Sequence, residues 1–445
     1  MAQFAAGTLA LRAQNTRRPN ILYIMLDDAG LHDFGCYGQQ KIQTPNVDGL
    51  AMQGMRFTAA YAGGSVCAPS RSCLMTGLHQ GHSPIRANAG TVPILASDVT
   101  LAKVLQQAGY RTGGYGKWGL GDVGSTGVPE KHGFDEFFGY YHQIHAHDYY
   151  TPFLWRNSQP VRMKKGDYSA NVIHEKAMQF LRAQTPDRPF FLYATYTLPH
   201  AKHEIPSVAP YQDKDWPEAE KIYAAMITLA DRQAGELLAL LHEKGMDNNT
   251  MVIFTSDNGG TGGEEGSGHK LGFFQSNGEL RGQKAQLYEG GIRDPFIVRW
   301  PGKVKPGTTC DFPLAFWDVM PTVAEITGTK APKGDGVSFV PSLMGKAQNR
   351  ERLLYWEQYR FDRKKNELIL DTLTCAGRFG DWKAIRLKAN SPLELYNLKS
   401  DPGEKNNVAA DNPEIVRKLD AMLKVAHQPP RTHSRGSFDF VEPPA

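Results

Sequence analysis

The chain has 445 residues, 41% of them hydrophobic and 22% charged, which is the composition of a folded globular protein with room for a large core and a smaller companion unit. Fifty basic residues against 46 acidic ones give a net charge of +4 without a long run of like charges, so neither a nucleic-acid groove nor a polybasic membrane anchor is indicated. No apolar stretch approaches the roughly eighteen residues of a membrane-spanning helix.

The amino-terminal stretch and the cysteines bear on the compartment in which the protein is found. Phe4 to Ala13 is apolar and rich in small residues, like the end of a secretory signal, although no basic segment precedes it. We therefore predict export to the periplasm or the medium, with residues 1–18 as an N-terminal tail or trimmed signal. The five cysteines are too few for a disulfide scaffold and form no C-x-x-C pair: Cys36, Cys67, Cys73, Cys310 and Cys375.

From residue 19 the chain alternates short apolar runs with helical patterns, which predicts an α/β domain with a large, mostly parallel sheet flanked by helices. Strands are predicted over Ile21–Leu26, Tyr110–Gly116, Phe190–Thr197, Met251–Ser256 and Phe296–Trp300. Helices are predicted over Asn46–Gln53, Thr100–Ala108, Asn171–Arg182 and Glu218–Lys244. We assign residues 19–345 to this α/β domain.

After about residue 345 the pattern changes to short strand-like pieces. They cover Leu353–Tyr359, Trp382–Leu387 and Leu393–Leu398, and a helix over Pro413–Val425 follows with proline in its first turn. Residues 346–445 are therefore predicted to form a smaller C-terminal α+β subdomain that carries an antiparallel sheet and ends in a tail.

Polar residues follow four of the predicted strands at the point where each strand ends. Asp27 and Asp28 come after the first, Lys117 after the second, His200 after the third, and Asp257 with Asn258 after the fourth. Any one of them is explained equally well as a turn or helix-cap residue. Ligands of open α/β sheets, however, bind outside the carboxyl ends of the strands, so these side chains are expected to converge. Three carboxylates and a carboxamide suit Ca²⁺ or, less well, Mg²⁺.

Cys67 stands at a predicted helix start. Pro69 favours a first helical turn, so a helix is predicted over Ser70–Leu78 with Cys67 just outside its N-terminus. Free N–H groups and the helix dipole at such a position favour anions and lower the pKa of a thiol, and Arg71 adds a positive charge. The alternative for a lone cysteine is a small buried hydrophobic residue.

Several ordered motifs carry a family resemblance. The segment Cys67-Ala68-Pro69-Ser70-Arg71 matches the C-x-P-S-R core of the type I sulfatases, and the match continues through Thr76-Gly77. Further blocks agree in order and spacing: Pro19-Asn20-Ile21 to Asp27-Asp28, Thr44-Pro45-Asn46, Gly116-Lys117-Trp118, Ser256-Asp257-Asn258-Gly259, Leu280-Arg281-Gly282, Glu289-Gly290-Gly291 and Leu395-Tyr396-Asn397-Leu398. The chain thus resembles this family, and bacterial arylsulfatase A-like carbohydrate sulfatases within it, over residues from about 19 to 425. The resemblance implies an alkaline-phosphatase-like fold.

The resemblance also implies roles for individual residues. Asp27, Asp28, Asp257 and Asn258 would hold calcium, with residue 67, converted from cysteine to formylglycine by a maturation enzyme, as nucleophile and further ligand. Arg71 would fix the formylglycine hydroxyl, Lys117 and Lys284 would hold sulfate oxygens, and His200 would give a proton to the bridging oxygen. These roles suit a sulfate ester, which has an anionic group to neutralise and an alkoxide leaving group to protonate.

One motif departs from the family pattern. The family sequence G-K-W-H-L-G is here Gly116-Lys117-Trp118-Gly119-Leu120-Gly121, so the histidine that assists the formylglycine hydroxyl is absent. We predict that His145 or His147, in the aromatic loop that follows Gly139, replaces it or grips the substrate. On an extended segment the two histidines would point the same way.

The substrate class follows from the same loop. Its His145-Ala146-His147 stretch is similar to stretches in bacterial carbohydrate sulfatases, which implies a sulfated saccharide, with small aryl sulfates as surrogates. Two alternatives stay open: a formylglycine-dependent phosphonate monoesterase or phosphodiesterase, and a catalytically silent glycan-binding relative in which Cys67 remains a thiol.

Overall fold

A computed structural model describes residues 18–88, 92–263, 267–362, 364–365 and 367–431. Its centre is a ten-stranded sheet in the order β11-β2-β10-β9-β1-β8-β4-β5-β6-β7. The five central strands run parallel: β9 (Thr250–Ser256), β1 (Asn20–Leu26), β8 (Phe190–Thr195), β4 (Arg111–Lys117) and β5 (Glu136–Tyr140). The outer strands are β2 (Met55–Phe57), β6 (Phe153–Arg156), β7 (Gln159–Arg162), β10 (Phe296–Arg299) and β11 (Thr308–Cys310).

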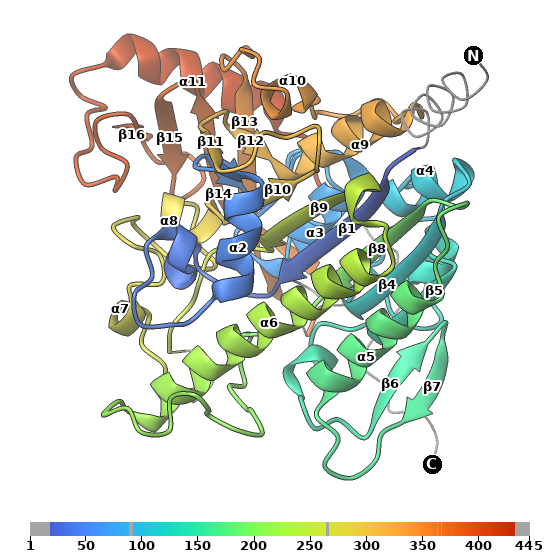
Figure 1. The fold of residues 1–445 in the computed structure, drawn as a ribbon. Coiled ribbons are helices and arrows are strands. Elements are labelled where there is room, and N and C mark those ends of the chain that lie inside the picture. The colour runs from blue at the N-terminus through green and yellow to red at the C-terminus, as the bar shows by residue number, and fades with distance from the viewer. Residues whose placement is uncertain (1–17, 89–91, 264–266, 363, 366, 432–445) are drawn as a thin grey trace, which may run out of the picture.

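Helices cover both faces of this sheet (Figure 1). One face packs against α2 (Pro45–Gln53), α5 (Ser169–Arg182) and α6 (Glu218–Glu243), and the other against α3 (Cys67–Thr76), α4 (Leu101–Gln107) and α9 (Val319–Thr327). The side chains of β1 alternate between the two cores: Leu22, Ile24 and Leu26 enter the first, and Tyr23 and Met25 enter the second. Burial on both faces explains why the strand reads as one continuous apolar run.

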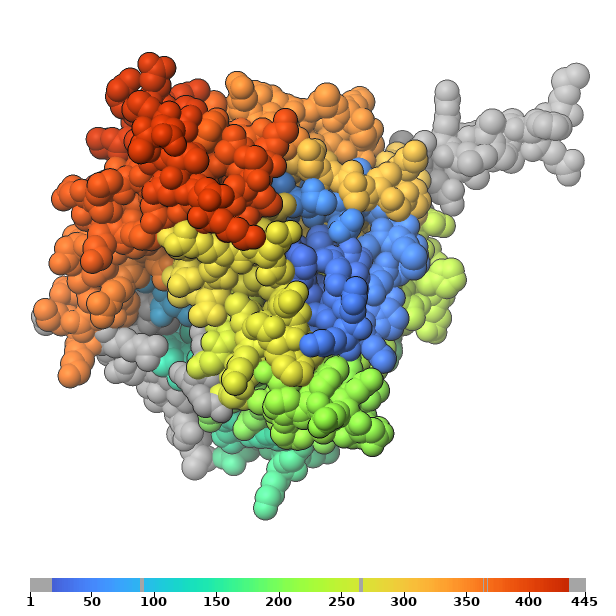
Figure 2. Space-filling model, turned by 90° about the vertical axis from the view of Figure 1, so that its left-hand side faces the viewer, coloured from blue at the N-terminus to red at the C-terminus, as the bar shows by residue number. Residues whose placement is uncertain are grey.

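The C-terminal unit contains an antiparallel sheet, as predicted, and this sheet has four strands. Its strands are β13 (Leu353–Asp362), β14 (Glu367–Phe379), β15 (Trp382–Arg386) and β16 (Glu394–Asn397), and α11 (Pro413–Ala426) packs on them. The sequence analysis missed β14. In Figure 2 this unit, in orange and red, lies directly against the yellow segment of the chain. The contact is fixed by Lys383, whose buried ammonium lies 2.9 Å from a carboxylate oxygen of both Glu289 and Glu404.

The remaining elements are short. They are β3 (Ala60–Tyr61) paired with β12 (Leu314–Ala315), α7 (Leu271–Phe274), α8 (Glu289–Ile292) and α10 (Val340–Leu343). Within the described ranges no helix combines the length and apolar composition needed to cross a membrane. The predicted export signal at Phe4 to Ala13 lies outside the described residues.

Candidate active site

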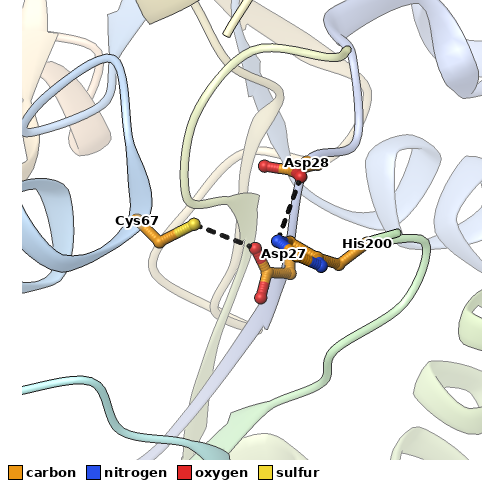
Figure 3. A group of neighbouring side chains, drawn as sticks. All are labelled: Asp27, Asp28, Cys67 and His200. Atoms are coloured by element: carbon orange, nitrogen blue, oxygen red, sulfur yellow. Dashed lines mark hydrogen bonds and ion pairs between the residues drawn. The ribbon is translucent and has the colours of Figure 1, made fainter. Parts of the chain in front are cut away.

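The predicted site residues come together at the carboxyl ends of the central strands. Asp27 follows β1 and donates its backbone N–H to Leu198 beyond β8, while Asp257, after β9, donates its own to Leu26, with both bonds 3.0 Å long. Figure 3 shows Asp27, Asp28, Cys67 and His200 pointing toward one another from the end of β1, the start of α3 and the loop after β8. One ligand atom from each of these four side chains lies within 4.8 Å of the others.

The carboxylates and the carboxamide form a buried oxygen cluster. Asn258 donates from Nδ2 to Asp28 Oδ1 at 2.8 Å, and Asp257 Oδ1 accepts the Asp28 backbone N–H at 3.2 Å. The Oδ1 atom of Asn258 is buried and has no hydrogen-bond partner among the described residues, so one ligand oxygen is unsatisfied without a cation. Burial and then the charge of Asp27 raise the pKa of Asp257. These features fit a hard, oxygen-binding cation such as Ca²⁺.

Three cationic side chains surround these carboxylates, all of them among the predicted site residues. Lys117 Nζ lies 2.7 Å from Asp27, and Lys284 Nζ lies 2.7 Å from Asp28. Arg71 donates to Asp257 Oδ2 at 2.8 and 2.9 Å and to the carbonyl of Lys117 at 2.7 Å. Although burial raises it, the positive charges around the carboxylate, led by that of Lys117, bring the pKa of Asp27 well below its usual range.

Cys67 differs from its prediction in two respects. The helix α3 begins at Cys67 itself and ends at Thr76, because proline is tolerated in a first turn whose N–H groups need no helical partner. The thiol is fully buried, with Sγ 3.3 Å from Asp27 Oδ1. Burial, followed by the charges of Asp257 and Asp27, raises the pKa of Cys67 well above its ordinary value, so the predicted lowering of the thiol pKa was wrong.

His200 lies on the Asp28 side of the cluster. Its Nε2 is 3.4 Å from Lys284 Nζ and 3.6 Å from Asp28 Oδ2, and its Nδ1 donates to the carbonyl of Ala201. Burial lowers the pKa of His200 to about 3 despite the opposing charge of Asp27. The imidazole is therefore neutral, with Nε2 facing the ammonium of Lys284.

The structure separates the two histidines of the aromatic loop. His145–His147 form a short 3-10 turn rather than the extended segment that we predicted, so the two rings point in different directions. His145 is buried, with Nε2 2.7 Å from the Thr151 hydroxyl and its ring packed on Tyr140 and Phe153. His147 instead lies against His200, with ring centroids 4.3 Å apart. Of the pair, only His147 reaches the predicted site.

The space beside Gly119 is filled by a residue that the sequence analysis did not single out. Gly119 has φ +79°, and a Cβ atom there would lie 2.0 Å from Nε2 of Gln143. Gln143 is buried and donates a long, 3.5 Å hydrogen bond to the Gly119 carbonyl, while its Oε1 has no partner among the described residues. The absence of a side chain at position 119 is the only sequence signal of this arrangement.

A second group of potential metal ligands does not fit a metal. His79, His82 and Asp335 have ligand atoms within 4.8 Å of one another. Gly81 donates its backbone N–H to His79 Nδ1 at 3.1 Å, so the proton of the neutral ring is on Nε2, which lies 3.8 Å from Asp335. His82 Nδ1 lies 2.9 Å from the same carboxylate. Asp335 Oδ2 also accepts the backbone N–H of His79 at 3.0 Å, so the carboxylate is satisfied by hydrogen bonds and fastens this loop to the rest of the domain.

The chain is similar to proteins of known activity along most of its length. A family model described as Sulfatase matches residues 19–329, and one described as N-sulphoglucosamine sulphohydrolase, C-terminal, matches residues 281–428. Arylsulfatase A of Homo sapiens is 31% identical over 453 residues, covering 91% of this chain and 86% of that protein. N-acetylgalactosamine-6-O-sulfatase of Bacteroides thetaiotaomicron is 29% identical over 484 residues, covering 92% and 93%. A crystal structure of Ps i-CgsB with k-i-k-neocarrahexaose matches with a TM-score of 0.80 at 28% identity, covering 92% and 93%.

Proposed function

Since the chain belongs to the sulfatase family, and is thus a sulfuric ester hydrolase as its motifs predicted, we propose that it hydrolyses sulfate monoesters of a sulfated carbohydrate through residue 67 and a bound calcium ion. The observation that carries this proposal is the setting of Cys67. Its buried thiol lies 3.3 Å from Asp27, at the start of α3, where the charges of Lys117 and Lys284 act on it. A nucleophile at this position faces both the oxygen cluster and the cations that an anionic ester needs.

The cofactors follow from the donor set. Asp27, Asp28, Asp257 and Asn258, together with residue 67, would hold Ca²⁺, and a bound cation would polarise the sulfate group. Formylglycine, made from Cys67, would supply a hydrated aldehyde as the attacking group. Because Cys67 is fully buried, the maturation enzyme that converts it to formylglycine is expected to act before α3 packs into the fold.

The chain's own residues account for binding and proton transfer. Lys117 and Lys284 would bind the sulfate oxygens, and Arg71 would hold residue 67 in place through its fixed position on Asp257. His200 would protonate the bridging oxygen from Nε2, the ring nitrogen that faces Lys284. His200 is neutral in the structure, so the arriving negative charge of the substrate has to raise its pKa before it can donate.

The carbohydrate part of the proposal rests on the relatives. Two of the matched proteins are named for saccharide chemistry, an N-acetylgalactosamine-6-O-sulfatase and a protein crystallised with a neocarrahexaose. We extend that class of substrate to this chain. The export that we propose, to the periplasm or the medium, rests instead on the apolar, small-residue stretch Phe4 to Ala13.

The decisive experiment combines mass spectrometry with turnover. In active protein from the native host, the peptide that contains residue 67 should have lost sulfur and gained a carbonyl, and Cys67→Ala should be inactive on aryl sulfates and sulfated saccharides. Faster turnover of matched phosphonate or phosphate esters would favour the phosphonate monoesterase or phosphodiesterase alternative. An intact thiol with retained glycan binding and no turnover would favour the silent relative.

A further inference from the structure

Lys284, one of the cationic side chains of the candidate site, lies on a loop that is closed on itself. Gly290 donates its backbone N–H to the Arg281 carbonyl at 2.7 Å, which joins the two ends of residues 281–290. A Cβ atom on Gly290 would lie 2.4 Å from a backbone carbonyl oxygen across the loop, so the ends can approach this closely only with glycine there. Between these ends Lys284 reaches into the site, where its Nζ lies 2.7 Å from Asp28. We call residues 281–290 the Lys284 loop.

The middle of the Lys284 loop is held on the α/β domain by two backbone hydrogen bonds. Lys284 donates its N–H to the Gly260 carbonyl at 3.1 Å, and Ala285 donates its own to Ser65 at 2.8 Å. Ala285 has φ +67°, a left-handed conformation that the Cβ atom of an alanine disfavours. Such a conformation persists only where the surrounding structure imposes it. The ends of the loop therefore have to be held as well as its middle.

One residue of the C-terminal subdomain contacts both ends of the Lys284 loop. Glu404, in the turn that follows β16, accepts the Glu289 backbone N–H at 2.6 Å with a carboxylate oxygen. Its main-chain carbonyl accepts from Arg281 Nη1 at 3.1 Å. The same Arg281 nitrogen donates to the Tyr396 hydroxyl, on β16, at 3.0 Å. The two ends of the loop are thus fastened to one turn of the neighbouring subdomain.

Glu404 is itself held rigidly. Its side chain is fully buried, and Lys383 Nζ lies 2.9 Å from Oε1. Its backbone also has a left-handed conformation, with φ +51°, and its N–H donates to the Asp401 carbonyl at 3.2 Å across the turn. The Asp401 carboxylate accepts the N–H groups of Lys405 and Asn406 at 3.0 and 2.8 Å. A carboxylate that is fixed in this way also fixes the loop that it holds.

We propose that Glu404 is a positioning residue for the Lys284 ammonium, so that a turn of the C-terminal subdomain sets the geometry of the sulfate-binding site. The proposal rests on the proposed role of Lys284 in binding sulfate oxygens. Electrostatic stabilisation works best when the charges are in place before the substrate arrives, and a displacement of about 1 Å can lower the rate about 100-fold. Glu404 does not touch the substrate, and its effect passes through the backbone of the Lys284 loop.

The alternative is that Glu404 only joins the two parts of the chain. With Glu289 and Lys383 it forms the buried ion cluster at the subdomain contact, so its removal is expected to lower the free energy of unfolding in either case. A change in stability therefore does not distinguish the two roles. The loss of activity has to be traced to Lys284.

A double-mutant cycle on kcat/KM traces it. With an activated aryl sulfate, at a temperature at which each variant is folded, Glu404→Ala should lower kcat/KM roughly 10- to 100-fold. In a Lys284→Ala background, which has no ammonium to position, the same change should lower kcat/KM by less than about twofold. The control is Leu423→Ala, which removes buried contacts of α11 within the same subdomain and should leave kcat/KM unchanged. Equal losses in both backgrounds, or wild-type activity of Glu404→Ala, would overturn the proposal.

A second variant covers the case in which Glu404→Ala does not fold. Arg281 is exposed and lies outside the buried ion cluster, so Arg281→Met removes the hold on one end of the Lys284 loop without leaving a buried charge unpaired. It should also lower kcat/KM in the wild-type background and have little effect in the Lys284→Ala background. The same loss in both backgrounds would contradict the proposal.

Hydrogen exchange separates this inference from the proposed function. The Glu289 amide is bonded to Glu404, so in Glu404→Ala the amides of the Lys284 loop should exchange roughly tenfold faster, whereas Leu423→Ala should leave their rates unchanged. Unchanged exchange in Glu404→Ala would refute the positioning role. If the wild type hydrolysed no sulfate ester, the proposed function would fail, while the exchange rates would still show whether Glu404 holds the loop.

Discussion

Gly119→Ala tests whether Gln143 occupies the place of a side chain at position 119. The backbone there has φ +79°, which costs an alanine about 1 kcal/mol relative to glycine. The new Cβ would also lie 2.0 Å from Gln143 Nε2, so the buried carboxamide has to move, and overpacking of this kind costs typically about 1–3 kcal/mol. We therefore expect Gly119→Ala to lower the free energy of unfolding by about 2–4 kcal/mol.

A double-mutant cycle isolates the clash from the backbone cost. Gln143→Ala alone should cost little, on the order of 1 kcal/mol, because Gln143 makes one long hydrogen bond and leaves its Oε1 unpaired. In Gly119→Ala/Gln143→Ala the clash is gone, so the double variant should be at least as stable as Gly119→Ala in urea denaturation. Strictly additive losses would refute the steric argument.

The same geometry explains the departure from the family motif. A histidine at position 119 would meet the same obstacle as alanine, so it is excluded as long as Gln143 keeps the side-chain conformation that it has here. Gln143, and not the buried His145, therefore occupies the space beside residue 119 that the family's histidine side chain would need.

Three further predictions concern the cation, pH and the subdomain contact. Chelation should abolish turnover and lower Tm, since a ligand at 100 times its Kd stabilises the folded state by about 2.7 kcal/mol; an unchanged Tm after verified metal removal would contradict the calcium site. Burial lowers the pKa of His145 to about 3 in the folded protein, so as the pH falls the unfolded chain takes up this proton before the folded one does. The free energy of unfolding therefore decreases below about pH 6.5. His145→Gln should remove on the order of 2 kcal/mol of the stability lost between pH 7 and pH 5, and an unaltered dependence of stability on pH would contradict this. Lys383→Met should lower the free energy of unfolding by roughly 3–5 kcal/mol in a denaturation experiment, because Glu289 and Glu404 lose their buried partner. A decrease below about 1 kcal/mol would show that these ion pairs are not needed for stability.

The central sheet and the gathering of its strand-end residues were predictable from local sequence. Apolar runs such as Ile21–Leu26 identify buried strands, and parallel strands bring whatever follows them to one edge of the sheet. Asp27 and Asp257 are 230 positions apart and still meet, because the register of β1 with β9 places Leu26 opposite Ser256. The family motifs then indicated which of these strand-end residues belong to one site.

The errors arose where tertiary contacts override local pattern. The His145–His147 stretch resembled an extended segment, but Tyr140 and Phe153 enclose the His145 ring and the backbone turns around it. The sequence around Cys67 showed a helix start but neither the burial nor the two carboxylates that raise the pKa of the thiol. β14 was missed because most of it is only half-buried or exposed, and its position depends on antiparallel pairing with β13 rather than on its own pattern.

The charges of the candidate site are balanced in pairs, and this balance links its two proposed ligands. Asp27 and Lys117 form one pair, Asp28 and Lys284 another, and Asp257 with Arg71 a third. In this arrangement each lysine forms a short ion pair with one carboxylate, Lys117 with Asp27 and Lys284 with Asp28. Carboxylate oxygens engaged by a divalent cation hold the lysines less strongly, which leaves the two ammonium groups available to an anionic ester. An anion that neutralises the lysines would in turn favour cation binding by the same coupling free energy, so calcium and sulfate are expected to bind this site cooperatively.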